Sequence, residues 1–426
     1  MLRVPIVHAR PGMVLSMPIH HPACPAVVLL RPGAEIDASS LRRLREIGVP
    51  ELWIRYPALD ELAEVVHPEV QGSCRDLVGI IGTAIDEVVL RSHARLDYPS
   101  YKRGVVGLLK QLSEHPKAAL YLGEMVGPQR PALRHAANVC MLSILMGLKL
   151  EFYLIRERSR LSGSSAKEIS GLGVGAMLHD VGMLRLPDAV LARWNSLQDE
   201  SDPEWQKHVV LGFDMVRGEI DATASAVVLH HHQKYDGSGF PRKRDLNGID
   251  HKVAGSEIHI FARIVAAADL FDRLRNPPGG TGCIPSVRVL NALRAEPYSR
   301  WIDPIVFRAL LAIAPPYPPG SLVTLTGGQR GVVAAWYPES PCQPLVYPIG
   351  SLDAEATKRA PRKRIAPIDL RTRTDMQIVE FDGFDVSNDN FTPTYKGEFD
   401  LIAFAKAMDN RASVLGESLE ELRRVG

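Results

Sequence analysis

The chain has 426 residues, with 50 basic and 49 acidic side chains, 46% hydrophobic residues and a net charge of +1. This composition excludes an intrinsically disordered chain and a protein that holds a nucleic acid polymer by a basic surface. The five cysteines form no CxxC pair, so we expect neither a disulfide framework nor a thiolate zinc site. The start lacks the pattern of a signal peptide, and Lys149 and Glu151 interrupt the most apolar stretch, 139–155. We therefore expect a cytoplasmic protein that does not enter a membrane.

The first 65 residues alternate short β-rich runs with one helical segment. The β-rich runs lie at 27–30 and 52–55, and the helix that ends at Gly48 is expected to begin at a cap formed by Ser39 or Ser40. Residues 1–65 therefore predict a small α/β accessory module.

The rest of the chain shows two further patterns. Between residues 70 and 315, apolar residues recur every three or four positions, which predicts an all-helical domain. Residues 316–426 are predicted to form a β-rich module, with a basic linker at 358–364 and a tail helix at 408–424. The expected fold class is mainly α, with small β-containing modules at the N- and C-terminal ends.

The histidines are unevenly distributed, since six of the 14 lie between residues 135 and 232. One histidine on an apolar helix is more often a satisfied core residue than a metal ligand. Asp180 and Asp269 are harder to explain in this way, because each follows an apolar run and an unpaired buried carboxylate costs several kcal/mol. A divalent metal shared among the helices would compensate both carboxylates. Iron, manganese and zinc all fit histidine and carboxylate ligands.

The order of these residues, H…HD…H…HH…DGxGxP…D, resembles the HD-GYP family, a branch of the HD-domain phosphohydrolases that hydrolyse cyclic di-GMP. The resemblance covers about residues 125–280. Its most specific motifs are HDxG at 179–182, HHxxxDGxGxP at 231–241 and AxADxxD at 266–272. The PGMVL segment at 11–15 also resembles the small module often found ahead of such domains.

The resemblance implies a centre of two divalent ions, with iron or manganese expected before zinc, and no organic cofactor. Asp180 would bridge the two ions, and a hydroxide held between them would attack phosphorus. The implied catalytic residues are His179, Asp180 and Asp272. The implied metal ligands are His135, His179, Asp180, His208, His231, His232 and Asp269.

The positions that would contact substrate depart from the family pattern. Met183 replaces a lysine, Phe240 replaces the tyrosine of GYP, and Gln233 replaces a glutamate. Pro131 stands where members with a third metal have a glutamate, so two metals are expected. The segment NPPGGTG at 276–282 replaces an RPYK-like sequence and its two cations. Each lost charge-assisted bond to phosphate is worth about 1.5–3 kcal/mol, so substrate binding is expected to be weaker.

Substrate contacts are expected from the DGSGFP turn and from nearby cations. Such dipeptides also mark ordinary tight turns, and the cations are equally well explained as solvated loop charges. The residues assigned to substrate binding are Asp236, Gly237, Gly239, Phe240, Pro241, Lys234, Arg275 and Arg185.

The leading interpretation is a metal-dependent phosphodiesterase that opens cyclic di-GMP to pGpG, with further cleavage to GMP left open. The first alternative is a weakly active or inactive protein that acts as a cyclic di-GMP receptor or interaction scaffold. A second is an HD phosphohydrolase for another phosphoester. In the family the turn also contacts partners such as GGDEF-domain proteins. Core packing and pairing in a homodimer explain the apolar helices at 72–113 equally well.

Overall fold

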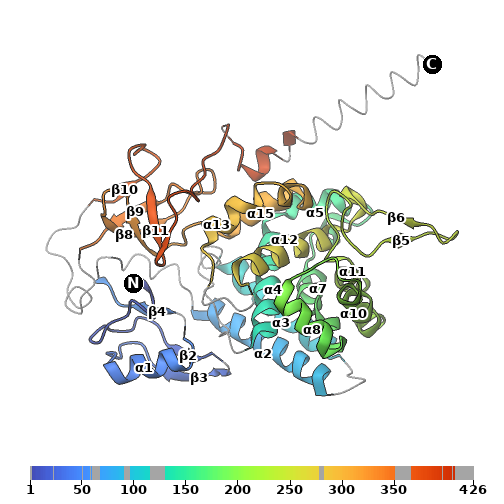
Figure 1. Ribbon diagram of the computed structural model, residues 1–426, viewed down its shortest axis with the longest axis horizontal. Coiled ribbons are helices and arrows are strands. Elements are labelled where there is room, and N and C mark those ends of the chain that lie inside the picture. The colour runs from blue at the N-terminus through green and yellow to red at the C-terminus, as the bar shows by residue number, and fades with distance from the viewer. Residues whose placement is uncertain are drawn as a thin grey trace, which may run out of the picture.

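The computed structural model describes residues 2–57, 59, 68–90, 96–115, 130–277, 283–350, 366–395 and 397–407, except for residues 23, 50 and 405. These residues form a helical body, with two small β-containing regions side by side along one flank (Figure 1). The mainly α fold class is therefore confirmed. The predicted basic linker at 358–364 and tail helix at 408–424 lie outside the described residues.

The N-terminal region combines two strand pairs with one helix. Its elements are β1 (Leu2–Pro5), β2 (Ile19–His21), β3 (Cys24–Leu30), α1 (Ala38–Glu46) and β4 (Glu51–Ile54). β1 pairs with β4 and β2 pairs with β3, both antiparallel. The predicted cap of α1 was wrong, because Asp37 precedes the helix and its Oδ1 accepts from the Ser40 amide at 2.6 Å. Ser39 and Ser40 lie inside the first turn, where their own backbone amides need an acceptor, and the residue before the helix supplies it.

The helical body carries the functional candidates. Its α-helices are α2 (Pro68–Leu90), α3 (Tyr98–Glu114), α4 (Pro131–Lys149), α5 (Glu151–Glu157), α6 (Gly163–Ala166), α7 (Ser170–Leu178), α8 (Asp188–Leu197), α9 (Pro203–Gln206), α10 (His208–Val216), α11 (Ala222–His230), α12 (Ile260–Arg275), α13 (Ser286–Leu293), α14 (Tyr298–Trp301) and α15 (Pro304–Ile313). The 3-10 helices η3 (Val181–Arg185) and η4 (Gly255–Glu257) and the hairpin of β5 (Lys243–Arg244) and β6 (Asp250–His251) complete it.

Helix α4 lies at the centre of the body and packs against α7, α12 and α15. It is apolar on most of its surface because neighbours cover several of its sides. Within the described part of the chain, α4 alone has the length and apolar composition of a membrane span, and 61% of its apolar window is buried.

A buried ion-pair network fixes α12, which carries Asp269 and Asp272. The Arg263 guanidinium, at the first turn of α12, donates to Asp303 at 2.6 Å and to the Tyr153 hydroxyl at 2.8 Å, and also pairs with Glu157. These partners come from α5 and from the residue before α15. Because each buried charge has an opposite partner, the network holds three helices in one register.

The C-terminal region is a six-stranded antiparallel sheet in the order β10-β9-β8-β7-β11-β12. Its strands are β7 (Leu322–Leu325), β8 (Arg330–Ala335), β9 (Leu345–Pro348), β10 (Ile368–Asp369), β11 (Ile378–Phe381) and β12 (Phe384–Asp385). These strands lie within the stretch 316–426, which the sequence predicted to be β-rich.

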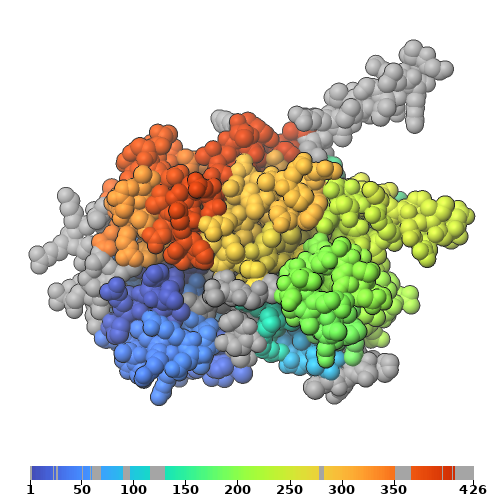
Figure 2. Space-filling model, in the orientation of Figure 1, coloured from blue at the N-terminus to red at the C-terminus, as the bar shows by residue number. Residues whose placement is uncertain are grey.

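The two terminal regions pack against each other, although they are far apart in the sequence (Figure 2). Leu322 and Val332 of the C-terminal sheet belong to the apolar core of the N-terminal region. The backbone amide of Arg3 donates to Gly320 at 3.0 Å, and its guanidinium contacts Glu51 and Ser321 at 3.1 and 2.7 Å. Pairing between the ends of the chain is a tertiary feature that no local sequence pattern indicates.

Candidate metal centre

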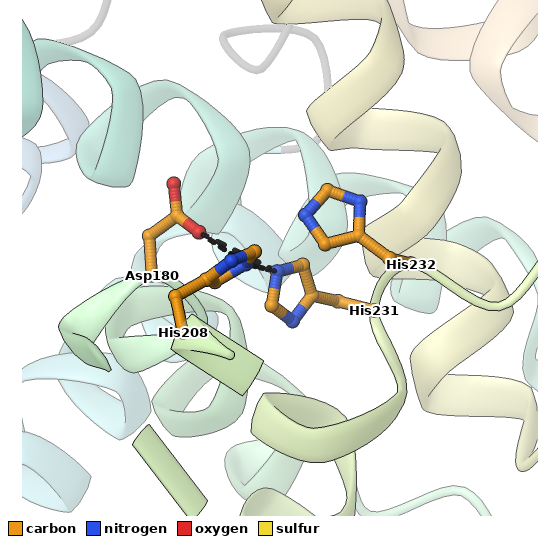
Figure 3. Close-up of side chains that lie close together, drawn as sticks. All are labelled: Asp180, His208, His231 and His232. Atoms are coloured by element: carbon orange, nitrogen blue, oxygen red, sulfur yellow. Dashed lines mark hydrogen bonds and ion pairs between the residues drawn. The ribbon is translucent and has the colours of Figure 1, made fainter. Parts of the chain in front are cut away.

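Five helices bring the predicted ligands to one point in the helical body. His135 lies in α4, His179 and Asp180 follow α7, His208 begins α10, His231 and His232 follow α11, and Asp269 lies in α12. Two groups have ligand atoms within 4.8 Å of one another, Asp180 with His208, His231 and His232, and His135 with His179 and Asp269. Figure 3 shows the first group, with Asp180 directed toward His208 and His231.

Three of the imidazoles are oriented in the same way by the ends of their helices. Nδ1 of His179 contacts the Ala176 carbonyl at 2.8 Å, and Nδ1 of His231 contacts the Val228 carbonyl at 2.9 Å. Nδ1 of His208 contacts the carbonyl three residues earlier at 2.7 Å. A carbonyl only accepts, so each Nδ1 carries the proton and each neutral ring keeps Nε2 as a bare acceptor. This is the tautomer that a metal ligand needs.

The bare nitrogens converge with a carboxylate oxygen. Nε2 of His208 and Nε2 of His231 are 3.4 Å apart, and Asp180 Oδ1 lies 3.5 and 3.4 Å from them. In the tautomers set by the carbonyls, these three atoms are all acceptors. Acceptors placed together in a buried site require a positive charge between them, so the donor set fits a divalent cation.

The second group joins the first through Asp180. Asp180 Oδ2 is 3.7 Å from Nε2 of both His135 and His179, and Asp269 Oδ1 is 3.2 Å from His135 Nε2. Asp180 therefore faces both groups, as the predicted bridging role requires. Behind His135, Asp272 Oδ2 contacts Nδ1 at 2.7 Å. Asp272 therefore contacts the ring nitrogen of His135 that faces away from Asp180 and Asp269, and its catalytic role stays a prediction.

Three of the histidines have lowered pKa values, which suit cation binding, and the fourth does not. Burial lowers the pKa of both His179 and His208 to about 4, so both rings are neutral at pH 7. Burial also lowers the pKa of His232. For His135, burial opposes the proton, but hydrogen bonds that the ring donates to Asp269 and Asp272 raise its pKa to about 10. In the metal-free protein, the His135 proton thus supplies part of the charge that a metal would supply.

An apolar wall closes one side of the centre. The Trp205 ring lies 4.7 Å from His208 and 5.0 Å from His232, between ring centroids, and Phe240 stacks on His232 at 4.9 Å. Met183, which replaces the family lysine, packs in the same apolar cluster. Phe240 thus keeps the ring packing expected of the missing tyrosine, whereas Met183 brings no charge to the site.

Two glycines allow the backbones around the centre to approach closely. A Cβ atom on Gly182 would lie 2.0 Å from the His208 carbonyl oxygen and 2.5 Å from the Gly212 nitrogen. A Cβ atom on Gly239 would lie 2.3 Å from the His232 carbonyl oxygen. Both motif glycines therefore bring a backbone into contact with a segment that holds a ligand.

The DGSGFP turn is held by its own side chains. Asp236 Oδ1 accepts from the Ser238 amide at 2.9 Å, and Gly237 has φ +77°, a conformation that favours glycine. The Phe240–Pro241 peptide bond is cis, and Gln233 donates to the Pro241 carbonyl. Gln233 thus ties the turn to the segment after α11.

The three predicted substrate cations occupy different surroundings. Lys234 pairs with Glu200 at 2.9 Å, and Arg275 donates to the Ser286 hydroxyl at 2.7 Å. Arg185 is half-buried at the end of η3. Lys234 is linked to the ligand cluster by a continuous set of ion pairs, through Glu200 and Arg273 to Asp269.

The sequence interpretation missed several residues that contact the ligands. Arg273 pairs with Asp269 at 2.9 Å, and its position four residues further along α12 was the available signal. Asn138 and Asn276 donate to Asp272 Oδ1 at 2.7 and 2.8 Å. Neither asparagine could be recognised without the tertiary structure.

Comparison with known proteins gives three findings of different extent. A family model described as an HD domain matches residues 154–306. Cyclic di-GMP phosphodiesterase PA4108 of Pseudomonas aeruginosa is 26% identical over 384 residues, which cover 81% of this chain and 84% of that protein. The cyclic di-GMP phosphodiesterase response regulator RpfG of Xanthomonas campestris is 33% identical over 115 residues, 26% of this chain and 28% of that protein.

Among solved structures, Bd1817, a HDG"Y"P protein from Bdellovibrio bacteriovorus, matches with 16% identity and a TM-score of 0.41, covering 72% of this chain and 97% of that chain. The match of residues 154–306 to the HD-domain model and the similarity to PA4108 along most of both chains agree with the resemblance to the HD-GYP family that the HDxG and DGxGxP motifs carry.

Proposed function

We propose that this protein is a metal-dependent phosphodiesterase that hydrolyses cyclic di-GMP to linear pGpG. The observation that carries the proposal is the convergence of Asp180 Oδ1 with Nε2 of His208 and His231, all within 3.5 Å of one another. The substrate is proposed from the names of the two curated relatives, both cyclic di-GMP phosphodiesterases.

The centre is proposed to hold two divalent ions, iron or manganese, and no organic cofactor. Bound ions of this kind supply Lewis acidity and lower the pKa of water toward neutrality. The proposed ligands are the seven that the sequence predicted: His135, His179, Asp180, His208, His231, His232 and Asp269.

The chain's own residues have separable roles in this proposal. The helix-end carbonyls fix the tautomers of His179, His208 and His231, so that these rings are ready to bind without rearrangement. Trp205 and Phe240 exclude water from one side, which strengthens electrostatic interactions within the site. The Asp236 turn, which follows His231 and His232 in the chain, is proposed to contact the phosphodiester.

A turnover assay tests the proposal. The purified chain, loaded with Mn²⁺ or Fe²⁺, is incubated with cyclic di-GMP and with related cyclic dinucleotides, and the products are separated by anion-exchange chromatography. We expect pGpG to form. The variant His231→Gln should lower turnover by at least roughly a hundredfold and lower metal content, because it removes a ligand. The matched control is His230→Gln, at the adjacent histidine outside both ligand groups, and it should retain both.

Two outcomes would reject the proposal. Absence of cleavage with all cyclic dinucleotides, in protein shown to contain metal, would reject phosphodiesterase activity. Binding of cyclic di-GMP without turnover would support the receptor alternative instead.

The remaining sequence predictions form part of the same proposal. They are the division at 1–65, 70–315 and 316–426, a cytoplasmic location, contacts with GGDEF-domain or other signalling proteins, and a homodimer. The assigned substrate residues, including Arg185 and Arg275, also remain predictions.

A further inference from the structure

Two cations next to the proposed metal centre share one carboxylate. Arg273 Nη1 lies 2.9 Å from Glu200 Oε1, and Lys234 Nζ lies 2.9 Å from Glu200 Oε2. The same Arg273 guanidinium contacts Asp269 through Nε at 3.0 Å and through Nη2 at 2.9 Å. Glu200 therefore bridges the two cations with one oxygen each, directly behind a proposed metal ligand.

The cations do not depend on Glu200 for their positions. Lys234 Nζ lies 3.3 Å from the centroid of the Trp301 ring, and the Arg273 guanidinium lies 6.0 Å from that of Trp194. Cation–π contacts of this kind hold a charge over a ring without neutralising it. The side chains of Lys234, Arg273 and Glu200 are each about one-fifth exposed, so all three remain accessible to a small anion.

The local charge balance changes when Asp269 binds metal. Without metal, two cations face the two carboxylates of Glu200 and Asp269. A metal ion that binds Asp269 takes up that carboxylate's charge, so Arg273 and Lys234 then face Glu200 alone, with a net charge of +1. Glu200 lies between α8 and α9, in a segment that supplies no proposed metal ligand. An incoming anion can therefore replace the Glu200 carboxylate without disturbing a ligand.

We propose that Arg273 and Lys234 form the phosphate subsite of the centre, and that Glu200 is its internal occupant, which a phosphate group of the substrate displaces. The inference rests on the proposed function for the identity of the substrate. The subsite would supply two cations near the centre, where Met183 and the segment 276–282 lack the cations expected from the family pattern. Phosphate suits the position because arginine and lysine together bind it through charge-assisted hydrogen bonds.

Binding of inorganic phosphate to the metal-loaded protein tests the inference without turnover. Isothermal titration is carried out on the wild type, E200Q, K234Q and the double variant E200Q/K234Q. An internal competitor reduces the apparent affinity for phosphate in proportion to the fraction of time that the subsite is free. Since E200Q removes the charge of that competitor, it should tighten phosphate binding on the order of tenfold. K234Q should weaken binding, and the gain from E200Q should shrink in the double variant.

The matched control is E204Q, which removes one negative charge nearby, from an exposed residue of α9 paired with Lys207 at 2.7 Å. It should leave phosphate affinity within about twofold of the wild type, since an exposed, screened charge acts weakly. If E200Q does not fold, Glu200→Asp provides the second variant, because the shorter side chain cannot bridge both cations. It should tighten binding by a smaller factor.

The results separate the subsite from the proposed function. Equal phosphate affinity in E200Q and E204Q, or a gain in E200Q that persists in full in the double variant, would overturn the subsite even if the wild type hydrolyses cyclic di-GMP. A different outcome would support the subsite and reject the proposed function. In that case E200Q binds phosphate more tightly, this gain requires Lys234, and the wild type cleaves no cyclic dinucleotide.

Discussion

Replacing Asp272 by asparagine tests whether this residue sets the tautomer of His135. Asp272 Oδ1 accepts from Asn138 and Asn276 at 2.7 and 2.8 Å, while Oδ2 contacts His135 Nδ1 at 2.7 Å. In Asp272→Asn, the amide oxygen must keep the Oδ1 position to satisfy both asparagine donors. Its NH₂ group then faces His135 Nδ1 and donates to it. The proton of a neutral His135 ring therefore moves to Nε2, where the ring can no longer bind a metal.

The opposite amide orientation does not rescue His135. With the oxygen toward His135, the NH₂ group would face the two donors of Asn138 and Asn276, so two hydrogen bonds of about 1 kcal/mol each would be lost. Loss of one such positioning partner typically lowers metal affinity by roughly tenfold to a hundredfold. We expect Asp272→Asn to lie in that range, with the fold intact.

Metal affinity is measured by competition with a fluorescent chelator, together with metal content and circular dichroism. The control is Asp214→Asn, the same substitution at an exposed residue of α10, which should leave metal affinity unchanged. Unchanged affinity in Asp272→Asn would refute the tautomer argument, because the substitution replaces the carboxylate oxygen that His135 Nδ1 contacts at 2.7 Å.

Three further predictions follow from the same geometry. Gly182→Ala should lower the free energy of unfolding in urea by about 1–3 kcal/mol or more and weaken metal binding, because its Cβ meets the His208 backbone. Gly163→Ala is the control, since its Cβ meets nothing within 4 Å, and it should change neither quantity. Burial, with Arg158 and Arg263 nearby, lowers the pKa of His259 to about 4, so the unfolded state binds the extra proton between about pH 6.5 and 4 and stability falls as pH falls. From pH 7 to pH 5 the wild type should lose roughly 1–2 kcal/mol more than His259→Asn, whose amide oxygen can still accept from Phe261; parallel losses would contradict this. Removing metal with EDTA should lower the melting temperature reversibly, since ligand at a thousand times its Kd stabilises by about 4 kcal/mol; an unchanged melting temperature would argue against a bound metal.

The centre was predictable because its signal is local in the sequence. The ligands lie inside apolar helices, as His135 and Asp269 do, or next to the end of a helix, and a buried charge there needs a partner. The helical periodicity of residues 70–315 and the order of the motifs then indicated which histidines and aspartates would share a divalent metal as that partner. Glycines such as Gly182 and Gly239 have a physical reason only once the backbone approaches are known.

The parts that the sequence did not indicate depend on contacts between distant segments. Glu200 is an ordinary acidic loop residue until folding places it between Arg273 and Lys234. The packing of the N-terminal strands against the C-terminal sheet depends in the same way on Arg3 and its partners, which are more than 300 residues apart. Periodicity carries no information about which surfaces meet at such distances.

The loss of the family tyrosine and lysine affects the site in different ways. Phe240 stacks on His232 with 21° between the rings and contacts Trp205 edge to face, so the ring still limits the motion of a ligand. The hydroxyl is lost, but the packing that orients His232 is kept. Met183 has no such equivalence, because it contributes apolar area where the family has a charge. The positive charge that phosphate requires must therefore come from elsewhere in the chain, and the pair formed by Arg273 and Lys234 is connected to the metal ligands through Asp269.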